Sequence, residues 1–166
     1  TDGEGLKDVP LARVLIHHNR IEGTALALND YGGLEMNMGG VAYGYNNISG
    51  RSTGHWPGGY MGVGTMNIAY PIYLDGAYKM YMFNNIAFGY TADEKNPYQS
   101  KAEAFFMVFG FLNSCVNNTF YRHGKAIGGS SGNRNDIMGN VTAEIVREFI
   151  ATNRTGNPSL VGGNDD

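Results

Sequence analysis

Short hydrophobic runs that end in asparagine recur along the chain and give the first indication of its fold. In each unit an apolar run leads into an Asn turn, and an apolar residue then begins the next run. The unit occurs five times, and its turn asparagines are Asn19, Asn47, Asn85, Asn118 and Asn140. Recurrence with matching flanks predicts repeated strand-and-turn units that pack against one another.

A second type of strand alternates with the first. Residues 24–30 and 70–76 are short apolar runs that finish at Asp30 and Asp75, and residues 125–130 are a weaker version without the acid. Each repeat is therefore expected to contain at least two strands. Residues 142–150 are predicted to form either a short capping helix or an irregular last repeat.

The expected fold class is all-β: a right-handed, single-stranded parallel β-helix (a solenoid) of about five to six coils with loop insertions. It would form one domain over residues 1–166. Stacked coils repeat each position at about 4.8 Å, so an inward Asn amide can bond the same amide of the next coil. The alternative is that Asn marks exposed turns of a β-meander. The predicted insertions are Gly50–Gly64, which holds the only Trp, and Tyr90–Ser100.

Composition agrees with an all-β chain and narrows the partners. The chain has 25 Gly, 11 Tyr and 8 Phe and only 16% charged residues, which favours turns and strands over helices. The net charge of −3 argues against nucleic acid as a partner. No apolar stretch is long enough to span a bilayer. The one cysteine, Cys115, lies in an apolar run and is predicted to be a core residue.

The two acids that follow the second strand type are the candidate catalytic residues. With one Asn corner per coil, Asp30 and Asp75 would lie one coil apart, with their Cα atoms roughly 5 Å from each other. Paired carboxylates about 5–5.5 Å apart suit a retaining glycosidase, and a wider spacing suits an inverting one. Glu35 is a third candidate acid. The alternative is that both aspartates are ordinary turn residues.

Aromatic residues near these acids could bind sugar rings. The candidate substrate-binding residues are Glu35, Tyr31, His55, Trp56, Tyr60, Tyr73 and Tyr78. Exterior stacking between coils is the alternative for the tyrosines. His17 and His18 are expected to face opposite ways on a strand, so no metal site is predicted there. No cofactor and no metal are expected.

Four segments resemble a known class of proteins. Residues 26–34, 45–48, 72–76 and 83–86, with an Asp-x-Gly-Gly turn at Asp30 and a Tyr-Leu-Asp turn at Asp75, resemble right-handed parallel β-helix (pectin-lyase-like) carbohydrate-active proteins. The resemblance is closest to family 141-type glycoside hydrolases and covers about residues 9–142. It implies that Asp30 and Asp75 are the catalytic pair.

The expected function is that of a secreted or cell-surface glycoside hydrolase that cleaves a polysaccharide with two carboxylates. The first residue, Thr1, indicates either a removed targeting segment or a piece of a longer polypeptide. One alternative is a polysaccharide lyase, for which Arg51, Lys79 and Lys101 are available cations. Another is a non-catalytic carbohydrate-binding, adhesion or assembly module that self-associates through exposed coil ends.

Overall fold

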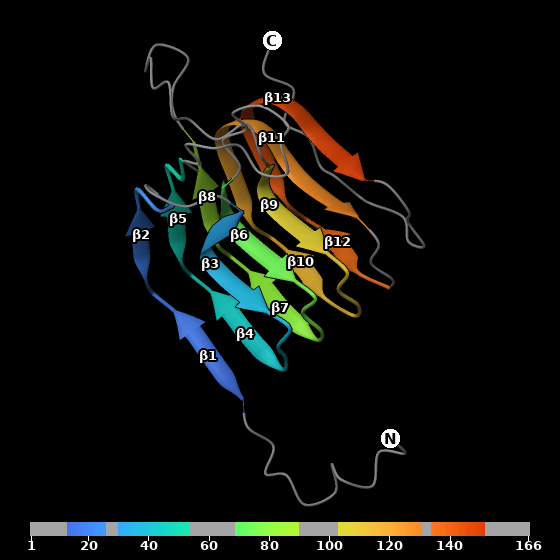
Figure 1. The fold of residues 1–166 in the computed structure, drawn as a ribbon. Helices are drawn as coiled ribbons and strands as arrows, with labels where there is room; N and C mark the ends of the chain where they lie inside the picture. The colour runs from blue at the N-terminus through green and yellow to red at the C-terminus, as the bar shows by residue number, and fades with distance from the viewer. Residues whose placement is uncertain (1–12, 26–29, 54–68, 90–102, 131–133, 152–166) are drawn as a thin grey trace, which may run out of the picture.

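The computed structural model describes residues 13–25, 30–53, 69–89, 103–130 and 134–151 (Figure 1). These residues contain thirteen β-strands and no helix. All of the strand pairs are parallel.

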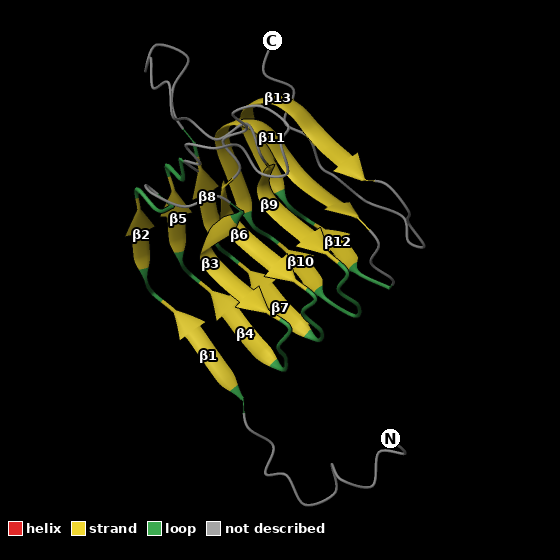
Figure 2. Cartoon of the chain, in the orientation of Figure 1, coloured by secondary structure: helices red, strands yellow, loops and turns green. Residues whose placement is uncertain are grey.

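The strands form two sheets (Figure 2). The five-stranded sheet consists, in spatial order, of β1 (Val14–His17), β4 (Ala42–Tyr45), β7 (Met80–Phe83), β10 (Ser114–Val116) and β12 (Asp136–Met138). The eight-stranded sheet has the order β2 (Arg20–Glu22), β5 (Ile48–Gly50), β8 (Ile86–Phe88), β11 (Thr119–Ser130), β9 (Glu103–Val108), β6 (Ala69–Asp75) and β3 (Tyr31–Asn37). The eighth strand, β13 (Val141–Ala151), pairs with β11.

The all-β content is confirmed, but the predicted single-stranded right-handed β-helix is wrong. The described strands are organised as two sheets, each made of parallel strands, and the larger sheet nearly closes on itself. The cause is β11, which pairs with β8 through residues 119–121 and with β9 through residues 125–130. The prediction assumed a turn after every short strand. In β11 the chain instead bends at Arg122, at a φ of 50°, and continues as one strand.

Of the two alternatives predicted for residues 142–150, a capping helix or an irregular last repeat, the helix is wrong. This segment belongs to β13, which pairs with β11 from Thr119↔Val141 to Gly129↔Ala151. A helix here would have left the outer backbone edge of β11 without these partners. The long strand β13 therefore adds one more strand to the eight-stranded sheet.

The predicted asparagine ladder is confirmed. Nδ2 of Asn47 donates to Oδ1 of Asn85 at 2.9 Å, Asn85 donates to Asn118 at 2.9 Å, and Asn118 donates to Asn140 at 3.1 Å. Asn19 begins the series with a 3.0 Å bond to Asn47. Successive members are 28, 38, 33 and 22 residues apart in the sequence. The ladder therefore keeps one corner in register although the lengths of the repeats differ.

A column of left-handed residues stands directly before the ladder. Its members are His18 (φ 56°), Asn46 (54°), Asn84 (53°), Asn117 (52°) and Gly139 (62°). Asn and Gly adopt this conformation at lower cost than other residues, which explains the repeated Asn-Asn pairs. The first Asn makes the turn and the second enters the core.

The core lies between the two sheets. Phe105, Phe120, Ile72, Ile127 and Met80 are among its largest fully buried side chains. Cys115 is also fully buried, in agreement with its prediction as a core residue, and burial raises the pKa of its thiol well above the ordinary value. This cysteine is therefore a packing residue and a poor nucleophile.

Candidate functional site

A sharp bend crosses the outer face of the eight-stranded sheet at β3 and β6. The Tyr70 and Tyr73 rings, three residues apart on β6, have centroids only 4.5 Å apart. On a straight strand such residues point to opposite faces. On β3 the bend requires glycine, because a Cβ on Gly32 would lie 2.7 Å from Cβ of Tyr73. The Gly32 N–H also donates to Oε2 of Glu35, at 2.8 Å.

Three aromatic rings fill the bend. Phe106, on β9, stacks on Tyr70 at a centroid distance of 4.8 Å and an interplanar angle of 7°. The Phe106 and Tyr73 centroids are 5.9 Å apart. Both tyrosines are almost fully buried. The rings form a packed aromatic surface, beside which charges are poorly solvated.

Carboxylates surround these rings. We refer to Asp30, Glu35, Asp75 and Glu103, together with Tyr70, Tyr73 and Phe106, as the acidic–aromatic cluster. The pKa of Tyr70 lies above its ordinary value because of burial and then the charge of Glu103. The pKa of Tyr73 is also raised, by burial and then by the charges of Asp30 and Asp75. Both phenols are therefore neutral hydrogen-bond donors at neutral pH.

Asp30 has the perturbed carboxyl of the cluster. Burial raises its pKa above the ordinary value, and the charge of Asp75 raises it further. A hydrogen bond with Tyr73 acts in the opposite direction and lowers it. A carboxyl that is partly desolvated and close to a second carboxylate holds its proton to higher pH, as a general acid requires.

The predicted register between the two aspartates is wrong. Asp75, at the end of β6, is opposite Asn37 of β3, and Nδ2 of Asn37 donates to its Oδ2 at 3.3 Å. Asp30 precedes β3, where Tyr31 is opposite Ala69. The prediction took residues 24–30 as the counterpart of residues 70–76, whereas residues 31–37 are the segment that pairs with β6. The predicted Cα spacing of one strand, and the stereochemistry inferred from it, therefore have no support.

The structure divides the other predicted substrate-binding residues. Glu35 and Tyr73 belong to the cluster, and Tyr31, which is 49% exposed, directly follows Asp30. Tyr78 instead stacks on Phe111 at 5.6 Å, which is the exterior stacking considered as an alternative. His55, Trp56 and Tyr60 lie outside the described residues.

Glu103 and its partner Lys125 were not among the predicted site residues. Glu103 is 8% exposed and forms an ion pair with Nζ of Lys125 at 3.2 Å. A side chain at Gly128 would collide with Glu103, so this glycine leaves the space for the carboxylate. No repeated pattern marks Glu103, and only the pairing of β9 with β6, where Phe105 is opposite Ile72, brings it to Tyr70.

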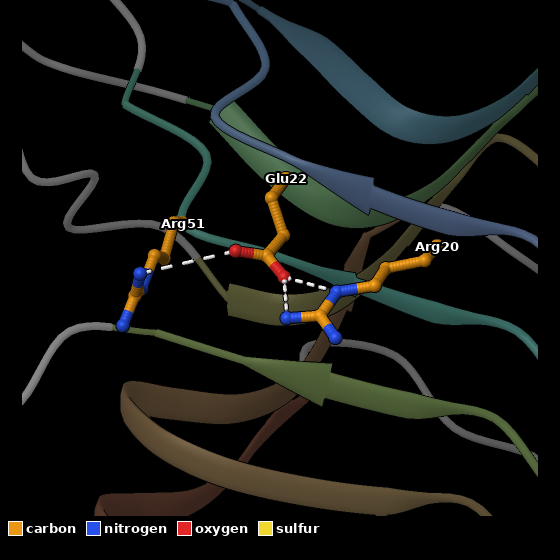
Figure 3. Close-up of polar contacts among 3 residues, drawn as sticks. All are labelled: Arg20, Glu22 and Arg51. Carbon is orange, nitrogen blue, oxygen red and sulfur yellow. Dashed lines mark hydrogen bonds and ion pairs between the residues drawn. The ribbon is translucent and has the colours of Figure 1, made fainter.

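Of the cations considered for a lyase, the two that the structure describes, Arg51 and Lys79, are not gathered at the cluster. Figure 3 shows Arg51 and Arg20 both directed at the carboxylate of Glu22. The Arg51 guanidinium also lies 5.8 Å from the ring centroid of Phe88. Lys79 is exposed, at the turn before β7, and Lys101 lies outside the described residues. Arg51 is thus bound at a corner between repeats.

The expectation that His17 and His18 face opposite ways is wrong. Their Nδ1 atoms are 2.9 Å apart because His18 has a left-handed backbone. His17 also stacks on Tyr45, with a centroid distance of 4.9 Å. Among the described residues, no group of three or more His, Cys, Asp and Glu side chains is arranged to hold a metal ion.

Comparisons with protein-family models, with curated proteins and with solved structures found no match for this chain. In the described ranges no helix has the length and hydropathy needed to cross a membrane.

Proposed function

We propose that this chain hydrolyses a glycosidic bond of a polysaccharide, with Asp30 and Asp75 as the two carboxylates. The observation that carries the proposal is the environment of Asp30. Its pKa is raised by partial burial and by the charge of Asp75, although a hydrogen bond with Tyr73 acts in the opposite direction. The resemblance of the Asp30 and Asp75 turns to those of family 141-type glycoside hydrolases points to the same pair.

In this mechanism Asp30 is the general acid. It protonates the oxygen of the departing sugar as the glycosidic bond breaks, while the Asp75 carboxylate, partly exposed at the end of β6, stabilises the positive charge that develops at the anomeric carbon. A water molecule then adds to that carbon and gives its proton to the Asp30 carboxylate, which restores the acid. Tyr73 is a positioning residue, because its phenol fixes the Asp30 carboxyl. The exposed ring of Tyr31, next to Asp30, offers a flat apolar surface for a sugar ring. A polysaccharide substrate fits a secreted or cell-surface enzyme.

The test is release of reducing ends from a panel of plant and algal polysaccharides. Asp30→Asn and Asp75→Asn should each lower kcat by at least about 100-fold, and each variant should retain its fold by circular dichroism. Asp136→Asn is the matched control, since Asp136 is an exposed aspartate of the five-stranded sheet, and it should leave turnover unchanged.

Two results would reject the proposal. The first is unchanged turnover in both the Asp30 and the Asp75 variant. The second is formation of unsaturated products that absorb in the ultraviolet, which would indicate a lyase.

A further inference from the structure

A groove crosses the outer face of the five-stranded sheet, on a different sheet from the acidic–aromatic cluster. Its volume is about 280 Å³. Tyr81 and Phe83 of β7 form one wall, and their register partners on β10 are the much smaller Ser114 and Val116. This step from large to small side chains between neighbouring strands creates the groove. The exposed turn residues Asn84 and Asn117 line its end.

The aromatic wall of the groove is supported by stacking on the neighbouring strand β4. Tyr81 stacks on Tyr43 of β4 at a centroid distance of 5.0 Å and an interplanar angle of 14°. Phe83 stacks on Tyr45 at 5.0 Å and 5°. Ligand binding would not have to order these rings, so little conformational entropy would be lost at this wall.

The chemistry of the lining selects the ligand class. The surface of the groove is almost entirely apolar, and none of its lining residues is a Lys, Arg, His, Asp or Glu. Asn84 and Asn117 add amides that can both donate and accept hydrogen bonds. Asp136, the register partner of Ser114 on β12, is exposed and would disfavour an anionic ligand. An aromatic wall next to amides matches the apolar face and the hydroxyl rim of an uncharged sugar ring.

We infer that this groove is a second, non-catalytic binding site for a neutral polysaccharide. The volume is at the small end of ligand sites, so the groove takes a single sugar unit of a longer chain. Tyr81 and Phe83 contact the ring, and Asn84 and Asn117 bond its hydroxyls. The site does not depend on hydrolysis at Asp30 and Asp75, and it would hold the polymer on the protein between cleavage events.

The test is affinity gel electrophoresis in gels that contain soluble polysaccharides. The neutral panel is galactomannan, xyloglucan, arabinoxylan and mixed-linkage β-glucan, and alginate and polygalacturonate are the anionic comparison. The protein carrying both Asp30→Asn and Asp75→Asn should be retarded by at least one neutral polymer. Ser114→Tyr, which extends the Tyr43–Tyr81 stack into the groove, should weaken that retardation about tenfold or more, and so should Tyr81→Leu.

Ser114→Thr is the matched control because it hardly changes the volume, and its retardation should equal that of the parent. Val116→Phe fills the groove from the next outward position and replaces Ser114→Tyr if that variant does not fold. Three results would overturn the inference: retardation that neither filling variant reduces, retardation by the anionic polymers alone, and no retardation by any polymer. Loss of hydrolysis in Asp30→Asn with retardation intact would leave this site standing.

Discussion

Nδ2 of Asn85 donates to Oδ1 of Asn118 at 2.9 Å, and the same Oδ1 accepts the backbone N–H of Asn85, also at 2.9 Å. Asn85 in turn accepts both equivalent bonds from Asn47 and gives its second amide hydrogen to the carbonyl oxygen of Gly44. The buried Asn85 amide thus satisfies two backbone groups of the preceding repeat, the N–H of Asn47 and the carbonyl oxygen of Gly44.

Asn85→Ala should lower the free energy of unfolding by roughly 3 kcal/mol or more, because it leaves several buried polar groups without partners. Urea denaturation measures the change. Asn84→Gly is the control, since Asn84 is exposed and left-handed, with a φ of 53°. Glycine adopts that φ freely, so the control should change stability by less than about 1 kcal/mol. Equal destabilisation in the two variants would show that the ladder does not stabilise the fold.

Gly32→Ala should weaken the bend that forms the acidic–aromatic cluster. Its Cβ would lie 2.7 Å from Cβ of Tyr73 and 2.9 Å from the backbone oxygen of Leu34, and backbone cannot move aside cheaply. We expect a loss of about 1–3 kcal/mol and a lower melting temperature. At Gly124 a Cβ would meet nothing within 4 Å, so Gly124→Ala should be close to neutral. A melting temperature of Gly32→Ala equal to that of the native protein would contradict the tight packing at Gly32.

His123 should make stability depend on pH. It is 5% exposed, and within the described part of the chain its Nδ1 has no hydrogen-bond partner. Burial lowers its pKa from 6.5 to about 4. Below pH 6.5 His123 binds a proton in the unfolded chain but stays neutral in the folded chain, so the free energy of unfolding should fall as the pH drops from 6.5 to about 4. The loss should be on the order of 3 kcal/mol.

The measurement for His123 is urea denaturation at pH 7, 5.5 and 4, with each variant compared with the native protein. His123→Phe should remove the contribution of this residue, so its unfolding free energy should fall less over this range. The exposed His18 provides the control, and the unfolding free energy of His18→Asn should change with pH as that of the native protein does. If the unfolding free energy of His123→Phe fell with pH as steeply as that of the native protein, groups other than His123 would cause the acid sensitivity.

Tyr73→Phe should move the pH profile of the proposed hydrolysis. The Tyr73 hydrogen bond lowers the pKa of Asp30, so its loss should raise that pKa. An acid with a higher pKa remains protonated to higher pH, and the alkaline limb of kcat should therefore shift upward. Tyr78→Phe, outside the cluster, should leave the limb in place. A downward or absent shift would mean that Tyr73 does not position Asp30.

Some features of the chain follow from local turn chemistry and could be read from the sequence. The Asn-Asn pairs mark a left-handed corner followed by an inward amide, and five repetitions made the ladder recognisable. A shorter amide pair was missed: Asn135 accepts the backbone N–H of Asn113 at 3.0 Å, and Asn113 accepts that of Met80 at 3.0 Å. Two members give no visible repeat in the sequence.

The sequence by itself determined the strand content, the stacked Asn corner and the buried position of Cys115, because each depends on residue type and on neighbours in the chain. Only the tertiary structure decided that β11 continues as one strand through its bend at Arg122 and joins β8 and β9 into one sheet. It also decided that Asp75 is opposite Asn37 and that Glu103 reaches Tyr70. These relationships depend on long-range strand register across insertions of unequal length, and no local pattern of residues encodes that register.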